Sequence, residues 1–429
     1  MKTKNQRRPE KPALIFSLES LLNNLGRQIR TKREIKPEQW PLILKVLTDN
    51  EVSPGGPYYN INKEIDPVLN LRIFNFLKSQ GIILPKLEKF LNQDPRKKNS
   101  KKIIPAEKLS PDESKIYRTI HRQISRDLKI WPQIIKARGR QEWLELGRSN
   151  QAREIILLPL WFIKSLGIDL NQRCCDLAEN LGRANFYLWL AYNIYDDILD
   201  EGIDASLLPI ANLAFRNFVA ILQGQKLSPA WDNFFHKLIN ELEAQNYQEY
   251  HFSKQYFKQP ITLQKKLNFE KLSSGLYKKS IAHAAGPLAI LSFLKVSPGT
   301  KEFRIIFSFF KNYLNARQLD DDVHDWESDL KRKKATPTLI FLTQKAANQA
   351  KNDLDHKHLR KIMFEIALPT INIQLAKFIK VADQNLKNST LIKQRAYLKR
   401  LIEPLSENMA RTESLRSDLL KFKNAYQGF

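Results

Sequence analysis

The sequence is poor in cysteine and glycine, and each shortage excludes a class of protein. Its 429 residues contain only two cysteines, Cys174 and Cys175, which are adjacent and therefore make a poor disulfide. They also lack the spacing of a zinc site. Glycine is sparse at 14 residues, and apolar residues recur at helical spacing with little strict alternation. We therefore predict an all-α protein from a reducing compartment rather than a disulfide-rich or β-sheet domain.

Signals for secretion and for membrane insertion are also missing. The first residues, MKTKNQRRPEKPALIF, contain no apolar core and no small-residue cleavage site of a signal peptide. The longest apolar stretch, Ile155 to Ile163, is too short to span a bilayer and contains Pro159. From these absences we expect a cytoplasmic protein.

Positive charge, in contrast, is abundant. The formal net charge is +25, with 70 Lys and Arg against 45 Asp and Glu. Such a field favours polyanionic partners, namely nucleic acid, an anionic membrane or phosphorylated substrates. No zinc-knuckle spacing or RNA-binding signature accompanies the charge, so we expect no specific nucleic-acid partner. A solvated basic surface and peripheral contact with an anionic membrane both stay open.

The chain divides by composition into four parts. A strong helix start at Ser110-Pro111-Asp112-Glu113, a cap followed by proline and acids, marks the last boundary. We predict a basic disordered tail (1–12), a helical N-terminal region (13–92), a Lys-rich linker (93–109) and an α-helical domain (110–429).

A first acidic motif ends a predicted helix of about 25 residues. It reads Asp196-Asp197-Ile198-Leu199-Asp200, so the sequence is D-D-x-x-D. Residues three and four apart share a helix face, so the carboxylates crowd together. Negative charge at a helix C-terminus is unfavourable, and a bound cation would relieve it. A solvated helix end is the alternative interpretation.

A second acidic motif repeats the pattern about 125 residues later. Asp321-Asp322-Val323-His324-Asp325 is again D-D-x-x-D, and Asp329 continues its acidic stripe. Carboxylate oxygens are the ligands that Mg²⁺ prefers, with water and substrate phosphate completing its shell. His324 has no further His or Cys ligand nearby in sequence, which argues against zinc. A charged surface helix with internal ion pairs is the alternative.

Lys279-Ser280 lies between the two motifs and precedes a run of small residues. Ala282, Ala284, Ala285 and Gly286 would allow close helix contact or a bend. A lysine that points into an acidic, metal-loaded cavity would bind phosphate oxygens as a point charge. A solvated surface lysine is the alternative.

Taken in order, these motifs resemble the trans-isoprenyl diphosphate synthase superfamily over roughly residues 110–429. D-D-x-x-D is followed by K-S and small residues, then by Gln318-x-x-D-D-x-x-D with trailing basic residues and Thr336-Pro337. The resemblance implies an isoprenoid-synthase-like helical bundle with a central cavity. The implied substrates are prenyl diphosphates, and a homodimer is left open.

The same resemblance assigns roles to individual residues. It implies about three Mg²⁺ ions, with Mn²⁺ as an alternative, held by seven carboxylates: Asp196, Asp197, Asp200, Asp321, Asp322, Asp325 and Asp329. Lys279 matches the diphosphate-binding lysine, Gln318 matches the glutamine before the second motif, and Lys333 or Lys334 stands near the family's G-K. Tyr192, one turn before Asp196, would close the bottom of the substrate pocket and so favour short products. Ordinary core packing explains a tyrosine at this position equally well.

Two departures from the superfamily pattern concern the second substrate. The G-G-K-R-x-R-P segment that helps to hold isopentenyl diphosphate is absent, and Arg153, ahead of Pro159, is the nearest candidate. The paired arginines usual after the first motif are missing too. A class I terpene cyclase, which ionises one prenyl diphosphate, would show both losses, and its metal triad overlays Asp321, Asp325 and Asp329.

The hypotheses therefore stand in an order. Gln318, Lys279 and Thr336-Pro337 favour a short-chain polyprenyl diphosphate synthase, a prenyltransferase. A terpene cyclase comes second and a head-to-head prenyl synthase third. A non-catalytic helical subunit and a basic nucleic-acid-binding protein remain open as non-enzymes.

The N-terminal region carries a weaker resemblance. Within residues 13–92, a turn-rich segment followed by Asp66 and Asn70 resembles one helical hairpin of the α/α-barrel repeats in prenyltransferase-like and terpene-cyclase β domains. An unrelated helical appendage fits the same residues equally well.

Overall fold

The computed structural model describes residues 109–133, 135–136, 138–140, 150–201, 205–258, 267–347 and 356–426. Within these ranges the regular structure is helical and no strand occurs, which confirms the all-α prediction. The predictions for the tail, the N-terminal region and the linker up to residue 108 lie outside the described residues and stay predictions. The described residues fall into two compact units, 109–347 with 367–410 and 356–366 with 411–426. Every candidate site residue belongs to the first unit.

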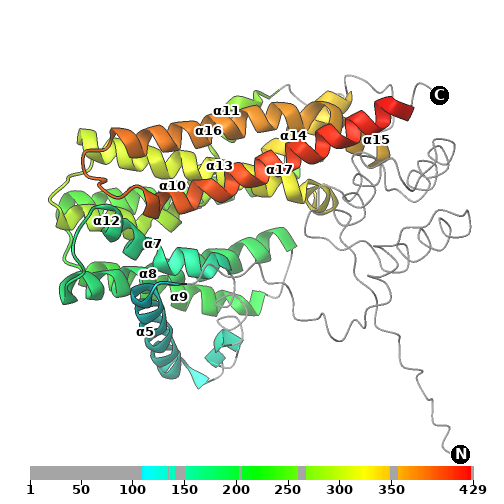
Figure 1. The fold of residues 1–429 in the computed structure, drawn as a ribbon. Helices are drawn as coiled ribbons and strands as arrows, with labels where there is room; N and C mark the ends of the chain where they lie inside the picture. Colours follow the sequence, from blue (N-terminus) through cyan, green and yellow to red (C-terminus); the bar gives the residue numbers. More distant parts are fainter. Residues whose placement is uncertain are drawn as a thin grey trace, which may run out of the picture. The chain divides into compact units, whose positions relative to one another are not determined.

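Helices follow one another along the chain with short connections (Figure 1). A π-helical turn, η9, joins α15 to α16, and the short 3-10 segments η7 and η8 precede α12. The elements are α5 (Pro111–Asp127), η4 (Leu128–Ile130), α7 (Asn150–Ser165), α8 (Gln172–Glu201), η5 (Ala205–Leu207), α9 (Leu208–Gly224), α10 (Pro229–Tyr256), α11 (Phe269–Ser273), η7 (Leu276–Lys279), η8 (Ile281–Ala284), α12 (Ala285–Phe293), α13 (Lys301–Arg332), α14 (Pro337–Ala347), α15 (His356–Ile362), η9 (Met363–Ala367), α16 (Leu368–Asn388) and α17 (Ala396–Tyr426).

Two long helices, α8 and α13, carry the acidic motifs and organise the first unit. α8 packs along α9 and α7, while α13 packs along α16 (Figure 1). The short segments η7, η8 and α12 connect the two groups: η7 contacts α10 and α13, and η8 and α12 contact α8. The segment that carries Lys279, η7, therefore packs on α13, and the next segment, η8, contacts both α8 and α13.

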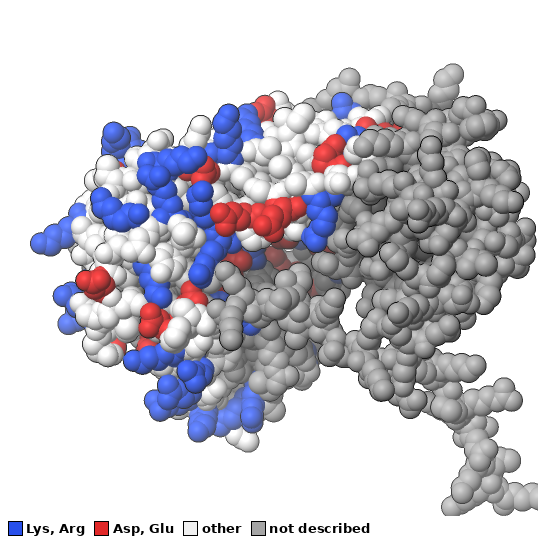
Figure 2. All heavy atoms as spheres, viewed as in Figure 1, with Lys and Arg blue, Asp and Glu red and all other residues white. Residues whose placement is uncertain are grey.

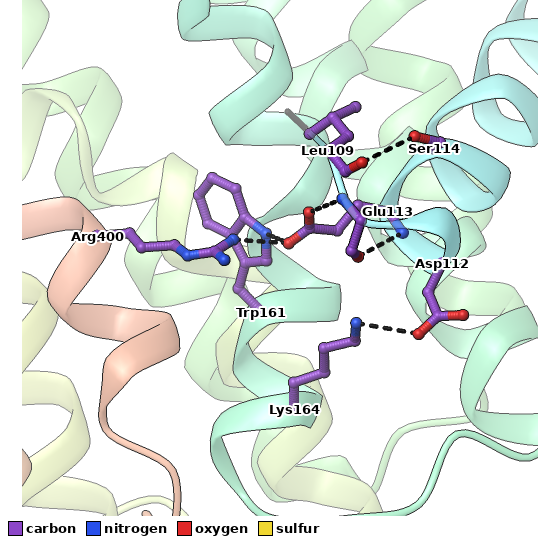
Figure 3. A network of polar contacts seen from close by, with 8 residues as sticks. Leu109, Asp112, Glu113, Ser114, Trp161, Lys164 and Arg400 are labelled. Atoms are coloured by element: carbon purple, nitrogen blue, oxygen red, sulfur yellow. Dashed lines mark hydrogen bonds and ion pairs between the residues drawn. The ribbon is translucent and has the colours of Figure 1, made fainter. Parts of the chain in front are cut away.

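The predicted helix start at Ser110 is confirmed. The Ser110 hydroxyl accepts a hydrogen bond from the Glu113 N–H at 3.3 Å, and the Glu113 carboxylate accepts one from the Ser110 N–H at 2.8 Å, a reciprocal capping box. Glu113 is buried and also accepts hydrogen bonds from Trp161 Nε1 and Arg400 Nη1, at 2.8 and 2.7 Å (Figure 3). One carboxylate thus joins α5 to α7 and to the start of α17.

A proline inside α7 determines how α7, α8 and α12 meet. Pro159 has no N–H, so the carbonyl of Ile155 loses its usual helical donor. The side chain of Asn185 on α8 donates to that carbonyl at 3.3 Å and accepts from the Gly286 N–H at 2.8 Å. A Cβ on Gly286 would lie 2.7 Å from Pro159 Cγ, so only glycine fits here. This confirms the close helix contact predicted for the small residues.

Two helical stretches are long and apolar enough to cross a membrane by length and composition alone, Ala205–Gly224 and His358–Asn388. Both include polar residues, unlike the uninterrupted apolar run from Ile155 to Ile163. Their windows are 28% and 50% buried inside the fold. Core helices of soluble proteins meet the same criterion, so the finding is weak evidence for a membrane span.

Candidate active site

The first acidic motif occupies the last turns of α8, as the sequence predicts. Asp196 and Asp197 are exposed, and Asp200 belongs to the helix although its side chain is not among those described. Tyr192, one turn earlier, is buried, and its ring packs edge-on against Tyr195 and Phe215, with centroids 5.6 and 6.4 Å away. Tyr192 thus packs partly against α9, and its role in product length stays a prediction.

The second motif lies within α13, which continues past it without a break. Asp322 and Asp329 are buried, whereas Asp321 and Asp325 are exposed. The helix ends because Lys333 adopts the left-handed conformation, with φ 56° and ψ 42°. The chain then reverses, and the Lys334 N–H donates to the Asp329 carbonyl at 2.9 Å. This cap turns the chain after the motif back toward the acids.

Lys279 connects the two motifs electrostatically. Burial alone would lower the pKa of its ammonium group, but the charges of Glu249, Asp322 and Asp196 outweigh burial and raise that pKa. Asp196 belongs to the first motif and Asp322 to the second. Charges from both acidic motifs, which lie about 125 residues apart in the sequence, therefore act on one lysine.

Glu249 on α10 is a site residue that the sequence did not reveal. Its Oε1 lies 3.3 Å from Lys279 Nζ and 3.9 Å from Lys334 Nζ. Burial would raise the pKa of Glu249, but the two ammonium groups lower it below the ordinary value. The carboxylate is thus held ionised and keeps both lysines beside the acidic motifs.

Burial of the second motif changes its acidity. Desolvation raises the pKa of Asp322 to about 8 and that of Asp329 to about 6, against the opposing pull of Lys279 and Lys334. Desolvation also raises the pKa of Asp321 to about 6, although its side chain is reached by solvent. Figure 2 shows acidic side chains gathered in a row on the face that it displays.

The donor set fits a hard divalent cation in type. All the candidate ligands are carboxylate oxygens, and Oδ2 of buried Asp322 has no hydrogen-bond partner. Within the described parts of the chain, however, no three His, Cys, Asp or Glu side chains lie close enough together to hold a metal ion. The metal assignments to individual aspartates therefore stay predictions.

A buried cation beside the second motif was also missed. Arg317 Nη1 donates to Glu154 Oε1 on α7 at 2.6 Å and to the Tyr313 hydroxyl at 2.9 Å, and Tyr313 bonds to the same carboxylate. Burial would lower the pKa of Arg317, but Glu154, Tyr313 and Asp321 raise it. Arg317 precedes Asp321 by one helical turn, and that spacing was the available signal.

Two predicted substrate-binding residues, Arg153 and Gln318, make no described contact with the acidic motifs. Arg153 lies near Tyr117 on α5. Burial raises the pKa of Tyr117, and the charge of Arg153 lowers it by a smaller amount. The buried Nε of Arg153 has no hydrogen-bond partner. Gln318 is partly buried on α13. Both assignments stay predictions.

The bundle has the fold of the prenyl diphosphate synthases. A geranylgeranyl pyrophosphate synthetase from the archaeon Geoglobus acetivorans matches with a TM-score of 0.54 at 16% identity, over 70% of this chain and 99% of that one. A decaprenyl diphosphate synthase from Rhodobacter capsulatus matches with a TM-score of 0.53 at 13% identity, over 72% and 99%. A geranylgeranyl pyrophosphate synthase gives 0.53 at 12%, over 70% and 99%.

These likenesses establish the isoprenoid-synthase-like helical bundle that the motifs implied. At such low identity they show the fold alone. No protein-family model matches the sequence, and no curated protein matches it either.

Proposed function

We propose that this protein is a Mg²⁺-dependent prenyltransferase that ionises an allylic prenyl diphosphate and condenses it with isopentenyl diphosphate to a short-chain product. One observation carries the proposal: the charges of Asp196 and Asp322, one from each acidic motif, both raise the pKa of Lys279. The fold shared with structures titled as prenyl diphosphate synthases supports it.

Each group of the site has a part in this chemistry. Lys279 and Lys334 would bind oxygens of the diphosphate as point charges, with Glu249 holding both ammonium groups in place beforehand. The carboxylates of the two motifs would hold Mg²⁺ or Mn²⁺, and the bound metal would supply Lewis acidity toward the departing diphosphate. Breaking the C–O bond releases diphosphate and leaves an allylic cation. The double bond of isopentenyl diphosphate attacks that cation, and loss of a proton from the resulting cation forms the new double bond.

The apolar part of α8 suits the cation that forms. Phe186 and Trp189 are buried, with ring centroids 5.9 Å apart, and lie two to three turns before the first motif. Apolar walls exclude water, which would otherwise quench the cation. Burial of these rings in the helix that ends in the acidic motif is consistent with a pocket for the hydrocarbon chain.

One observation favours a class I terpene cyclase as the second candidate. Isopentenyl diphosphate needs cations of its own, and the segment expected to supply them begins at Arg153. There, Glu154 is engaged with Arg317, and Arg153 lies beside Tyr117 on α5. A cyclase uses a single diphosphate and needs no second site.

The deciding experiment offers geranyl, farnesyl and geranylgeranyl diphosphate with Mg²⁺, each with and without isopentenyl diphosphate, and identifies products by mass spectrometry. Elongated diphosphates support the prenyltransferase. Hydrocarbons or alcohols made without isopentenyl diphosphate support the cyclase, and head-to-head products support the third hypothesis. No product from any substrate, with Mg²⁺ or Mn²⁺, would leave a non-catalytic subunit. Chelation of the metal should abolish turnover, and added Mg²⁺ should restore it.

A further inference from the structure

The outer face of α5 carries an uninterrupted row of basic residues. Counted along the helix and η4, the row recurs at steps of three, four, four and three, so its members share one face. They are all exposed: Lys115, Arg118, Arg122, Arg126 and Lys129. The opposite face buries Ile116, Ile120, Ile124 and Leu128 against the bundle. We call this row the α5 basic stripe.

Acidic groups do little to neutralise the α5 basic stripe. Of the acids on α5, Glu113 is buried, Asp112 pairs with Lys164 at 3.2 Å, and Asp127 pairs with Arg183 at 3.5 Å. From the neighbouring helix α8, Glu179 lies near Lys115 and Arg122, and Asp176 lies beside Glu179. Five cations face these two carboxylates, so the stripe stays positive.

The guanidinium groups of the stripe bond to their own helix. Arg118 Nε donates to the Ser114 carbonyl at 3.0 Å, and Arg122 Nη2 donates to the Thr119 hydroxyl at 3.1 Å. Such contacts are easily exchanged for phosphate oxygens. In Figure 2, Lys and Arg side chains gather where Figure 1 shows α5.

An exposed aliphatic residue lies at the end of the α5 basic stripe. Ile130, next to Lys129, is 84% exposed, the highest value among the described large hydrophobic residues. The adjacent Trp131 is buried, and Gly139 packs so closely on its ring that a Cβ would lie 2.6 Å from it. The residues on either side of Gly139, Arg138 and Arg140, are exposed.

We propose that the α5 basic stripe docks the protein on an anionic membrane surface, with Ile130 inserted among the lipid acyl chains. Cations that meet lipid phosphates beside an aliphatic side chain form the pattern of an interfacial membrane anchor. A single-stranded nucleic acid would instead be bound by exposed aromatic rings, and Trp131, the aromatic residue at this end of the stripe, is buried. The surface does not depend on the proposed reaction.

The test measures co-sedimentation of the full chain, without substrate, with vesicles of phosphatidylcholine and phosphatidylserine at physiological ionic strength. Each basic residue near such a surface contributes roughly fivefold in affinity. The triple variant R118Q/R122Q/R126Q should therefore bind on the order of 100-fold more weakly. Ile130→Ser should weaken binding up to about tenfold, because an apolar side chain no longer enters the acyl region.

A matched control removes the same charge elsewhere. K301Q/R304Q/K380Q changes three exposed residues on α13 and α16 and should bind like the wild type. Equal losses in both triple variants, wild-type binding by the α5 variant, or equal binding to phosphatidylcholine alone would overturn the proposal. Binding of the α5 stripe to RNA but not to vesicles would do so too.

Turnover of soluble prenyl diphosphates and the melting temperature should be unchanged in all of these variants, since every substituted side chain is exposed. Failure of the proposed reaction would show in the product assay, and failure of the docking surface in the vesicle assay.

Discussion

Glu249 Oε1 lies 3.3 Å from Lys279 Nζ, and the charges of Asp196 and Asp322, one from each acidic motif, act on the same lysine. Neither side chain is freely solvated, with exposures of 20% and 11%. Removing one partner of a buried pair leaves the other charge uncompensated, whereas removing both does not. Single and double variants of this pair therefore distinguish the loss of stability caused by an unpaired charge from the loss of a group needed for the reaction.

We expect Lys279→Met to lower the free energy of unfolding by roughly 3 kcal/mol, because Glu249 loses the nearer of its two cations and keeps only Lys334, at 3.9 Å. Glu249→Gln should cost less, about 1 kcal/mol, since the charge of Asp196 still offsets part of the charge of the lysine. The double variant should cost less than the sum of the two. Urea denaturation measures all three.

A matched control for this cycle exists on the surface. Lys377 pairs with Glu270, and both side chains are more than half exposed. Lys377→Met should change the unfolding free energy by about 0 to 0.5 kcal/mol. Additive losses at Lys279 and Glu249 would contradict the coupling.

Charge removal at the acidic motifs should affect turnover but not folding. Asp197→Asn and Asp321→Asn each remove a carboxylate from an exposed position, so the packing stays intact. We expect each to cut turnover of prenyl diphosphate by roughly 10²-fold or more, the scale of a lost electrostatic contact at a developing charge. Asp176→Asn, at the other end of α8, is the control and should keep wild-type rates. Wild-type rates in either motif variant would refute the metal-site assignment.

The sequence predicted the parts of the site that local spacing determines. The D-D-x-x-D patterns lie on helices, and the cap at Ser110 begins α5 as expected. Glu249, in contrast, lies 30 residues before Lys279, and Glu154 lies 163 residues before Arg317. Such pairs depend on how helices cross, which periodicity does not encode. Arg153 and Glu154 also could not be assigned from spacing alone. They are adjacent in the sequence, but Arg153 lies near α5 and Glu154 bonds to α13.

Asn185 should be coupled to Pro159. Asn185→Ala removes the partners of the Ile155 and His283 carbonyls and of the Gly286 N–H, and should cost roughly 3 kcal/mol. Adding Pro159→Ala restores a helical N–H for Ile155, so it should recover about 1 kcal/mol in the Asn185→Ala background. In the wild-type background the same change should gain less, since Asn185 already serves that carbonyl. Equal gains in both backgrounds, measured by denaturation, would show that the two residues act independently.

Glu113 should make the stability depend on acid pH. Burial would raise the pKa of this carboxyl, but hydrogen bonds from the Ser110 N–H, Arg400 and Trp161 lower it below 4.5. Because the folded state then binds the proton less readily than the unfolded chain, the stabilisation is present above about pH 4.5 and is lost as the pH falls through the folded-state pKa. Glu113→Gln should lower the unfolding free energy by about 2 kcal/mol at neutral pH, and the difference should shrink in acid. Asp112→Asn, whose carboxylate is exposed although its partner Lys164 is largely buried, should follow the wild-type curve closely at every pH (Figure 3). A constant difference between wild type and Glu113→Gln across this range would mean that the contribution of Glu113 does not come from its charge.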